Sequence, residues 1–191
     1  MINGEYQVLG IAGSLRKGSF NRGLLRAAVN VKPQGMNIDI CDISRIPLFN
    51  EDLRVDGGPD AVREFKDRIA GADGLLFAVP EYNYSMAGVF KNAIDWASRP
   101  IDTSPLVGKP IAMMGAGGGL GAGRAQYHFR QAAVFVNMIP MNRPELMVPH
   151  AWDKFAENGD LKDETYLPRI AEFLTAFVAW IKFVKAGQAA Q

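Results

Sequence analysis

Residues 8–21 read Val-Leu-Gly-Ile-Ala-Gly-Ser-Leu-Arg-Lys-Gly-Ser-Phe-Asn. The first five residues predict a buried strand, and a helical pattern starts near Phe20. The turn between them is rich in hydroxyl groups, glycine and cationic side chains. Backbone amides at the start of a helix carry the positive end of the helix dipole, so a turn of this composition is suited to binding a phosphate. The stretch therefore predicts an α/β fold with a phosphate site at a strand-to-helix turn.

Strands and helices alternate along the rest of the chain. Residues 75–79 and 111–114 are nearly continuous apolar runs, which are typical of parallel strands buried on both faces. The expected strands are 7–12, 38–43, 74–79, 110–115 and 145–148, and the expected helices are 20–30, 59–70, 86–98, 121–138 and a final covering helix over 167–181. This pattern predicts one doubly wound α/β domain over residues 1–191.

The composition narrows the function classes. A formal net charge of +1 gives no argument for binding nucleic acid or an anionic membrane surface. Cys41 is the only cysteine, so neither an intrachain disulfide nor a cysteine-rich metal site is expected, and no metal is predicted. The first residues lack the features of a signal peptide, and the apolar stretch 173–184 is too short to cross a bilayer. We expect a cytoplasmic protein.

The glycines of the first turn exclude one class of nucleotide site. Gly13 and Gly18 are spaced like the glycines of a P-loop, but Ser19 and Phe20 stand where a lysine and a serine or threonine are needed. The residues that hold a terminal phosphate and Mg²⁺ in P-loop NTPases are therefore absent from the turn. A Gly-x-Gly-x-x-Gly dinucleotide turn is absent there too.

What remains in this turn suits a single monophosphate. Ser14, Ser19 and Asn21 carry side-chain hydrogen-bond donors, and Arg16 supplies a positive charge. The first amides of the following helix add donors of their own. A simpler interpretation stays open, in which Ser19 only caps the helix and Arg16 is a solvated surface charge.

A second candidate segment follows the third strand. It reads Pro80-Glu81-Tyr82-Asn83-Tyr84-Ser85. Ligands of open parallel sheets bind outside the carboxyl ends of the strands, so this segment should lie beside the phosphate turn. Its tyrosines and its amide side chain offer a stacking surface and hydrogen bonds for a planar ligand. The alternative is a capped turn whose tyrosines are simply exposed.

The third segment is the glycine-rich stretch 115–123 that follows the fourth strand. Gly117-x-Gly119-x-x-Ala122 fits the dinucleotide fingerprint formally. However, no acidic residue follows about twenty positions later to bind a ribose. Glycines here let backbone amides approach a flat ligand closely, whereas the alternative is a flexible loop without a ligand.

Together, residues 13–21, the sequence Pro80-Glu-Tyr-Asn83 and the sequence Lys91-Asn-Ala-Ile-Asp-Trp96 resemble the NADPH-dependent FMN reductase family. Its members include bacterial chromate and quinone reductases and relatives of azoreductases. The resemblance covers roughly residues 6–150. It implies a flavodoxin-like fold, with a five-stranded parallel sheet in the order 2-1-3-4-5 and helices on both faces. It also implies tightly bound FMN and a homodimer or homotetramer.

The resemblance assigns roles to residues of all three segments. The first turn would hold the FMN phosphate, residues 80–83 would border the isoalloxazine ring, and residues 115–117 would lie along its pyrimidine edge. The cofactor-binding residues so implied are Ser14, Arg16, Ser19, Phe20, Asn21, Pro80, Glu81, Tyr82, Asn83, Ser85, Gly115, Ala116 and Gly117. Arg124, Tyr127 and Glu145 match residues that link subunits of tetrameric members.

These assignments imply a two-step oxidoreductase in which the cofactor carries the chemistry. A reduced nicotinamide, NADH or NADPH, would pass hydride to flavin N5 and leave, and a quinone, chromate or a similar acceptor would then take its place. No protein acid or base is required. Tyr84 and Arg99 are predicted to contact substrates, with Arg99 guiding anionic ones; alternatively, Arg99 only pairs with Asp95.

Three further activities stay open at this level. A non-enzymatic electron carrier of the flavodoxin type is disfavoured, because such carriers are usually strongly acidic. A phosphate-loop hydrolase would need a nucleophile in the turn, whereas Cys41 lies on the second strand. Finally, azo compounds or free FMN are alternatives to quinones as the main acceptor.

Overall fold

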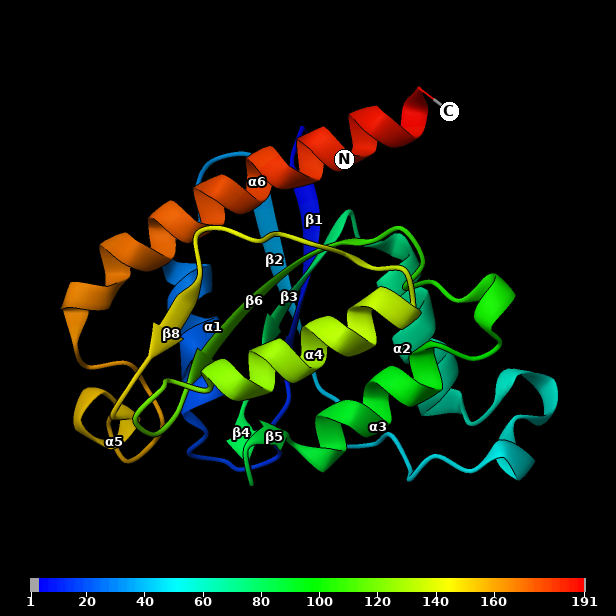
Figure 1. Cartoon of the computed structure of the whole chain (residues 1–191), viewed down its shortest axis with the longest axis horizontal. Helices are drawn as coiled ribbons and strands as arrows, with labels where there is room; N and C mark the ends of the chain where they lie inside the picture. The colour runs from blue at the N-terminus through cyan, green and yellow to red at the C-terminus, as the bar shows by residue number, and fades with distance from the viewer. Residues whose placement is uncertain (1–3, 191) are drawn as a thin grey trace.

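The computed structural model describes residues 4–190. Its sheet contains four long strands that all run parallel to their neighbours (Figure 1). Their order across the sheet is β2 (Met36–Cys41), β1 (Tyr6–Ala12), β3 (Gly74–Ala78) and β6 (Pro110–Ala116). Residues of β3 and β6 are buried along their whole length, as their continuous apolar sequence predicts.

The fifth position of the sheet is shared by two short strands. β7 (Ile139–Pro140) pairs with the first residues of β6, and β8 (Leu146–Val148) pairs with its last residues. The predicted strand order is therefore confirmed, but the predicted strand 145–148 supplies only one half of the fifth position. Sequence reasoning missed the other half, because two residues carry no periodic signal and Pro140 has no amide to donate.

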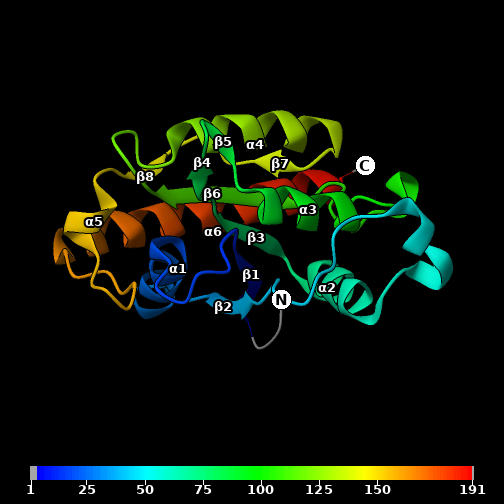
Figure 2. The same ribbon diagram turned by 90° about the horizontal axis from the view of Figure 1, so that it is seen from below.

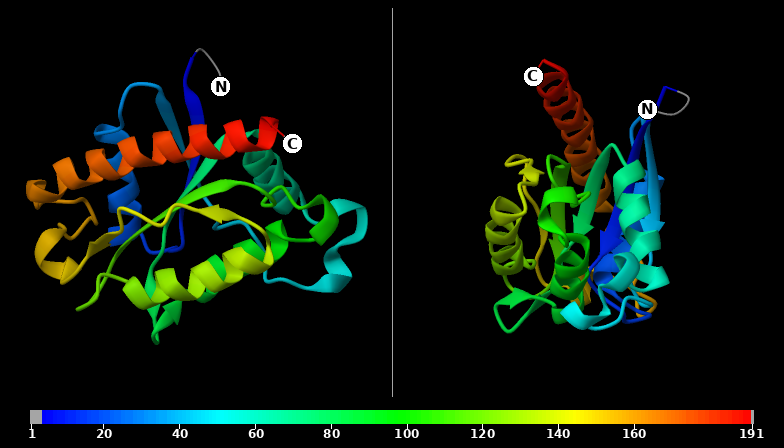
Figure 3. Two further views of the ribbon diagram at one scale, coloured as in Figure 1. Left: turned by 45° about the horizontal axis from the view of Figure 1, so that its top comes forward. Right: turned by 90° about the vertical axis from the view of Figure 1, so that its right-hand side faces the viewer.

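Helices cover both faces of the sheet, as predicted. The buried side chains of α1 (Phe20–Asn30) and α6 (Leu167–Ala189) join one apolar core, and α6 crosses the strands obliquely (Figure 3). The second core contains buried residues of α2 (Asp60–Gly71), α3 (Gly88–Ala97) and α4 (Gly123–Phe135). None of the helices in the described part of the chain is long and apolar enough to span a membrane.

The remaining elements are short and lie in the connections. They are the hairpin strands β4 (Glu81–Tyr82) and β5 (Ser85–Met86), the helix α5 (Ala151–Lys154) and the 3-10 turns η1 (Glu51–Leu53), η2 (Val55–Gly57), η3 (Ile101–Thr103) and η4 (Glu164–Tyr166).

A cluster of three aromatic rings fixes α3 and α4 on the sheet. Phe77 of β3 meets Phe90 of α3 and Phe129 of α4 edge-on, with ring centroids 5.5 and 4.8 Å apart. The two helix residues also meet each other at 4.8 Å. Edge-to-face pairs of this kind add to the free energy gained from burial. The cluster therefore holds α3 and α4 against β3 and against each other.

The end of α3 holds the long connection after β2. Trp96 is fully buried, and its indole N–H donates to the carbonyl of Pro47 at 2.8 Å. The amide of Asn92 donates to the same carbonyl at 2.8 Å and accepts from the backbone of Phe49. The sequence motif 91–96 thus serves to anchor a loop.

Candidate functional site

Three loops meet at the carboxyl edge of the sheet, as their positions in the sequence predict. They are the turn 13–19 after β1, the hairpin 81–86 after β3 and the glycine loop 115–123 after β6. Figure 2 is seen from below and looks onto this edge. Hydrogen bonds at the strand ends hold the starts of these loops side by side: Gly13 donates to Ala78 at 3.0 Å and Val79 donates to Met114 at 2.8 Å.

The phosphate turn presents a run of free backbone donors. None of the five consecutive amides of residues 17–21 donates a hydrogen bond to any other group within residues 4–190. The next amide, of Arg22, donates to Ser19 Oγ at 3.3 Å, so Ser19 does cap the helix. Backbone donors without partners cost free energy unless they are solvated or bound, and a phosphate satisfies several at once. The donor set therefore fits a phosphate group.

Close packing fixes the backbone of this turn. A Cβ atom on Gly13 would lie 2.7 Å from both Phe90 Cβ and Pro80 Cδ, and one on Gly18 would lie 2.6 Å from the carbonyl oxygen of Glu157. Any larger residue would displace the turn. The two glycines that resemble those of a P-loop are therefore required because neighbouring residues pack closely against them. The sequence pattern alone could not distinguish this packing role from a role in phosphate binding.

Arg16 lies on the exposed side of the turn. Its guanidinium donates to the carbonyl of Gly18 at 3.0 Å and lies 5.6 Å from the ring centroid of Phe20. Both contacts keep the charge next to the free amides. The backbone N–H of Arg16 also points at Ser14 Oγ, at 3.4 Å.

Asn21 has a role that its sequence position did not suggest. Its side chain is buried and makes two hydrogen bonds with Ala116, donating to the carbonyl and accepting from the amide, both at 3.0 Å. The side chain thus joins the phosphate turn to the glycine loop. The structure brings Asn21 to the site, but both the nitrogen and the oxygen of its amide group already bond to Ala116.

The hairpin between β4 and β5 places its tyrosines at the surface. Asn83 and Tyr84 form its two-residue turn, with φ angles of 49° and 65°. Tyr82 and Tyr84 are more than half exposed. Tyr82 also borders a hollow of about 260 Å³ whose other walls are residues 13–16 and 87–89. The hollow opens between the phosphate turn and the start of α3.

Glu81 and Ser85 of the hairpin face α4. The Glu81 carboxylate accepts from the backbone of Arg124 at 3.1 Å and from its guanidinium at 2.9 Å. Ser85 Oγ and His128 Nδ1 form a hydrogen bond of 2.9 Å. No local sequence pattern predicts either contact, because the partners are 43 residues apart.

The glycine loop combines a fixed backbone with open space. Gly117 donates to Val148 at 3.1 Å, and a Cβ atom on Gly115 would meet Val79 and Ala122 at 2.9 Å. At residues 118 and 119 an added Cβ atom would meet nothing within 4 Å. A planar group can therefore approach this part of the backbone closely.

Arg99 does not join these residues. It follows the last turn of α3, about 16 Å along the helix from Gly88 at the hollow. The carbonyl of Arg99 accepts from Lys66 Nζ, and Asp95 pairs with Lys91 at 2.7 Å instead of with Arg99. The structure thus gives no support for Arg99 as a substrate-binding residue.

Cys41 is unsuited to nucleophilic catalysis. Its thiol is buried at the end of β2, and burial raises its pKa to about 11. At neutral pH the group is a thiol rather than the reactive thiolate. This removes the only cysteine as the nucleophile of a hydrolase.

Comparison with known protein families identifies the family of this chain. The sequence pattern of the NADPH-dependent FMN reductase family matches residues 6–153. The chain belongs to this family. An NAD(P)H-dependent FMN reductase of Pseudomonas aeruginosa is 50% identical over 179 residues, which cover 93% of this chain and 96% of that protein. An NAD(P)H:quinone oxidoreductase of Solanum tuberosum is 47% identical over 180 residues, with 91% of each chain covered.

A solved structure of a similar flavoenzyme has the same fold as this member of the FMN reductase family. The flavoenzyme NAD(P)H:(acceptor) oxidoreductase of Paracoccus denitrificans superposes with a TM-score of 0.83 at 35% identity, covering 93% of this chain and 97% of that one. The predicted family, flavodoxin-like fold and enzyme class are thereby confirmed, with FMN as cofactor and NAD(P)H as co-substrate. The free amides and the open glycine loop fit the two ends of an FMN molecule.

Proposed function

We propose that the chain is an FMN-dependent oxidoreductase that transfers electrons from NAD(P)H to quinones. When bound, FMN supplies hydride acceptance and donation at its N5 atom. The run of unpartnered amides at residues 17–21, beside a hollow walled by Tyr82, is the observation that carries the proposal. The relatives named as FMN reductase and quinone oxidoreductase support the reaction class.

The residues of the site then divide into two groups. The amides of residues 17–21, with Ser14, Ser19 and Arg16, would hold the phosphate. Tyr82 and the open backbone at residues 118–119 would border the ring and leave space for a nicotinamide or a quinone in turn. Since both partners would use one space, the reaction would be ping-pong. The chain's contribution is binding, orientation and partial exclusion of water.

An absorption spectrum of the purified protein tests this proposal. We expect bound flavin whose visible band is lost on anaerobic addition of NAD(P)H and restored by a benzoquinone. An electron carrier would keep its band with NAD(P)H alone, and a hydrolase would release no flavin on denaturation. Either result would contradict the proposal. Chromate and azo dyes, tested as acceptors under the same conditions, show whether quinones are preferred.

Replacing Arg16 by alanine should weaken FMN retention. The guanidinium is the charged group that bonds to the phosphate turn itself, and a charge-assisted contact to phosphate contributes about 1.5–3 kcal/mol, or roughly tenfold to a hundredfold in affinity. Because Arg16 is exposed, we expect the lower end of this range. FMN titration of the flavin-free protein by fluorescence measures the change. Arg45→Ala, an exposed arginine paired with Glu64, is the control. Unchanged FMN affinity would remove Arg16 from the phosphate site.

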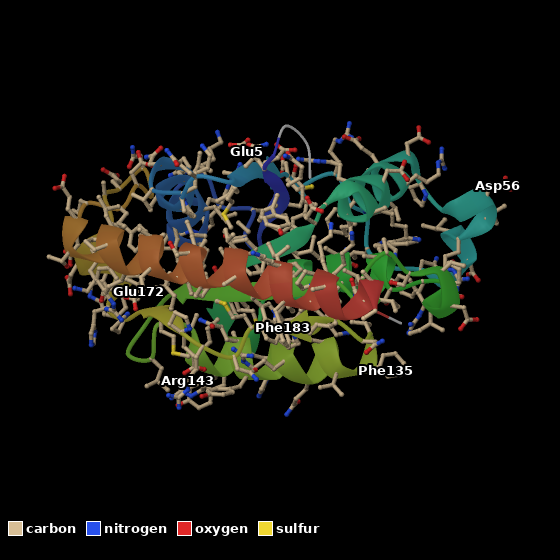
Figure 4. All side chains as sticks on the ribbon, turned by 90° about the horizontal axis from the view of Figure 1, so that it is seen from above. Glu5, Asp56, Phe135, Arg143, Glu172 and Phe183 are labelled. Atoms are coloured by element: carbon tan, nitrogen blue, oxygen red, sulfur yellow. The ribbon has the colours of Figure 1, made fainter. Side chains whose placement is uncertain are left out.

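The proposal includes assembly into a homodimer or homotetramer. An apolar surface lies at the side of the molecule where α4, β7 and α6 meet. On it Val134 and Phe135 of α4 are 78% and 68% exposed, and Phe183 of α6 is 69% exposed. Trp180 stacks on Phe183 and donates to the carbonyl of Ile139, which links α6 to β7. Figure 4 shows Phe135 at the end of α4 and Phe183 between α6 and α4.

We expect Phe135→Glu with Phe183→Glu to lower the molar mass measured by light scattering to that of one chain. Leu48→Glu changes a residue that is even more exposed and lies in the connection after β2, so it is the control. An unchanged mass would place the interface elsewhere.

Tyr127 and Glu145 are exposed and stay predicted interface residues, whereas Arg124 already pairs with Glu81 of its own chain. A cytoplasmic location and a single FMN-binding domain over residues 1–191 also stay predictions; residues 1–3 and 191 lie outside the described part.

A further inference from the structure

The N-terminus of α4 lacks a cap of its own. The residue before the helix, Ala122, has a left-handed backbone with φ 67° and no side chain that can accept a hydrogen bond. The amide of Gly123 donates to the carbonyl of Leu120 at 2.9 Å, but the next two helical amides need an acceptor from another part of the chain. The carboxylate of Glu81 supplies it. One oxygen accepts from the amides of Arg124 and Ala125 at 3.1 and 3.4 Å.

The other oxygen of this carboxylate holds the side chain of Arg124. Glu81 Oε1 accepts from Arg124 Nη1 at 2.9 Å, and the Glu81 side chain is only 14% exposed. A carboxylate that meets a helix N-terminus and a guanidinium at once is favoured by both the dipole and the opposite charge. Little exposure means that solvent screens these contacts weakly. Glu81 therefore fixes where the Arg124 guanidinium lies.

Arg124 in turn holds the tip of the hairpin. Its guanidinium carbon lies 3.9 Å from the ring centroid of Tyr84. Tyr84 has a φ of 65°, a left-handed conformation that is unfavourable for an aromatic residue, so contacts elsewhere must maintain it. The Ser85–His128 hydrogen bond, one turn further along α4, adds a second attachment. The turn and its second strand are thus fastened to α4, while Tyr82 borders the hollow.

We infer that Glu81 is a positioning residue, which acts through Arg124 and the first amides of α4 to hold the hairpin 81–86 as the wall at the ring end of the flavin site. That the hairpin walls a flavin site rests on the proposed function. The attachment of the hairpin to α4 is present in the protein without a ligand. It differs from a role in which Glu81 contacts the ring directly. In that case the Arg124 pair would be incidental.

A double-mutant cycle distinguishes these roles. Glu81→Ala and Arg124→Ala should each weaken FMN binding about tenfold, and the double variant should be no weaker than either single one, because all three lose the same attachment. Additive losses, or a loss with Glu81→Ala alone, would overturn the inference. Glu81→Gln keeps an acceptor for the helix amides, so we expect it to restore part of the affinity. Glu64→Ala, which breaks an exposed pair with Arg45, is the matched control.

Hydrogen exchange of the flavin-free protein provides a readout that is independent of the enzyme reaction. We expect the amides of residues 82–86 to exchange about tenfold faster in Glu81→Ala and in Arg124→Ala, and amides of β1 and β3 to keep their wild-type rates. Unchanged exchange in the hairpin would overturn the inference even if FMN binding fell. If only the proposed function is wrong, NAD(P)H will not reduce the flavin, but the hairpin amides of the two variants will still exchange faster than those of the wild type.

Discussion

Gly23→Ala is expected to lower the free energy of unfolding by about 3 kcal/mol or more, because it forces atoms into a packed contact that has no room. Gly23 lies in α1, and a Cβ atom there would overlap the carbonyl oxygen of Gly159 and lie 2.8 Å from its carbonyl carbon. The obstacle is backbone, so no side-chain rotation relieves it. Moreover, Gly159 has a φ of 85°, and a Cβ atom on it would lie 2.8 Å from the carbonyl carbon of Gly18, so the connection is itself closely packed and restricted from moving away.

For a chain of this length, 3 kcal/mol corresponds to a decrease of roughly 6–12 °C in Tm, which a thermal unfolding curve monitored by circular dichroism resolves. Gly71→Ala is the matched control, because Gly71 ends α2 with nothing within 4 Å of its added Cβ atom. We expect that variant to be neutral or slightly more stable, since alanine restricts the unfolded chain more than glycine does. Equal Tm values for the two variants would contradict the packing described for α1.

The sheet and the location of the site were predictable because their signals are local. Apolar runs such as 75–79 and 111–114 identify buried parallel strands, and the rule that ligands bind at the carboxyl ends of strands then brings the three loops together. The phosphate turn also carries its chemistry in consecutive residues. The family resemblance rests on the same stretches, so it extended the prediction to FMN.

The roles of single side chains were less predictable, because they depend on partners far along the chain. Glu81 meets Arg124 across 43 positions, and Asn21 meets Ala116 across 95. Charge and residue type are compatible with many such partners, and only the packed fold selects one. Arg99 is the converse case, and its contact with substrate stays a prediction. Its charge and its place near the tyrosine segment in sequence suggested a contact with substrate, but a helix of ten residues carries it to the other end of α3.

Asn21→Ala is expected to affect both stability and cofactor binding. The substitution removes both hydrogen-bond partners of the buried Ala116 backbone. Each buried group left without a partner costs about 1–3 kcal/mol, so we expect a loss of roughly 2–4 kcal/mol in the free energy of unfolding. Denaturant unfolding of the flavin-free protein measures it. Asn30→Ala, at the exposed end of the same helix, should change stability by less than about 0.5 kcal/mol.

The same variant separates the two ends of the proposed FMN site. Since Asn21 joins the phosphate turn to the glycine loop, its loss should let the two loops move independently, and a ligand that contacts both would then have to order them. We expect FMN affinity to fall at least about tenfold at a temperature where the variant is still folded, whereas inorganic phosphate, which needs only the turn, should bind nearly as before. Equal losses for FMN and phosphate would mean that Asn21 acts on the turn alone. Unchanged FMN affinity would mean that the glycine loop does not take part in binding the ring.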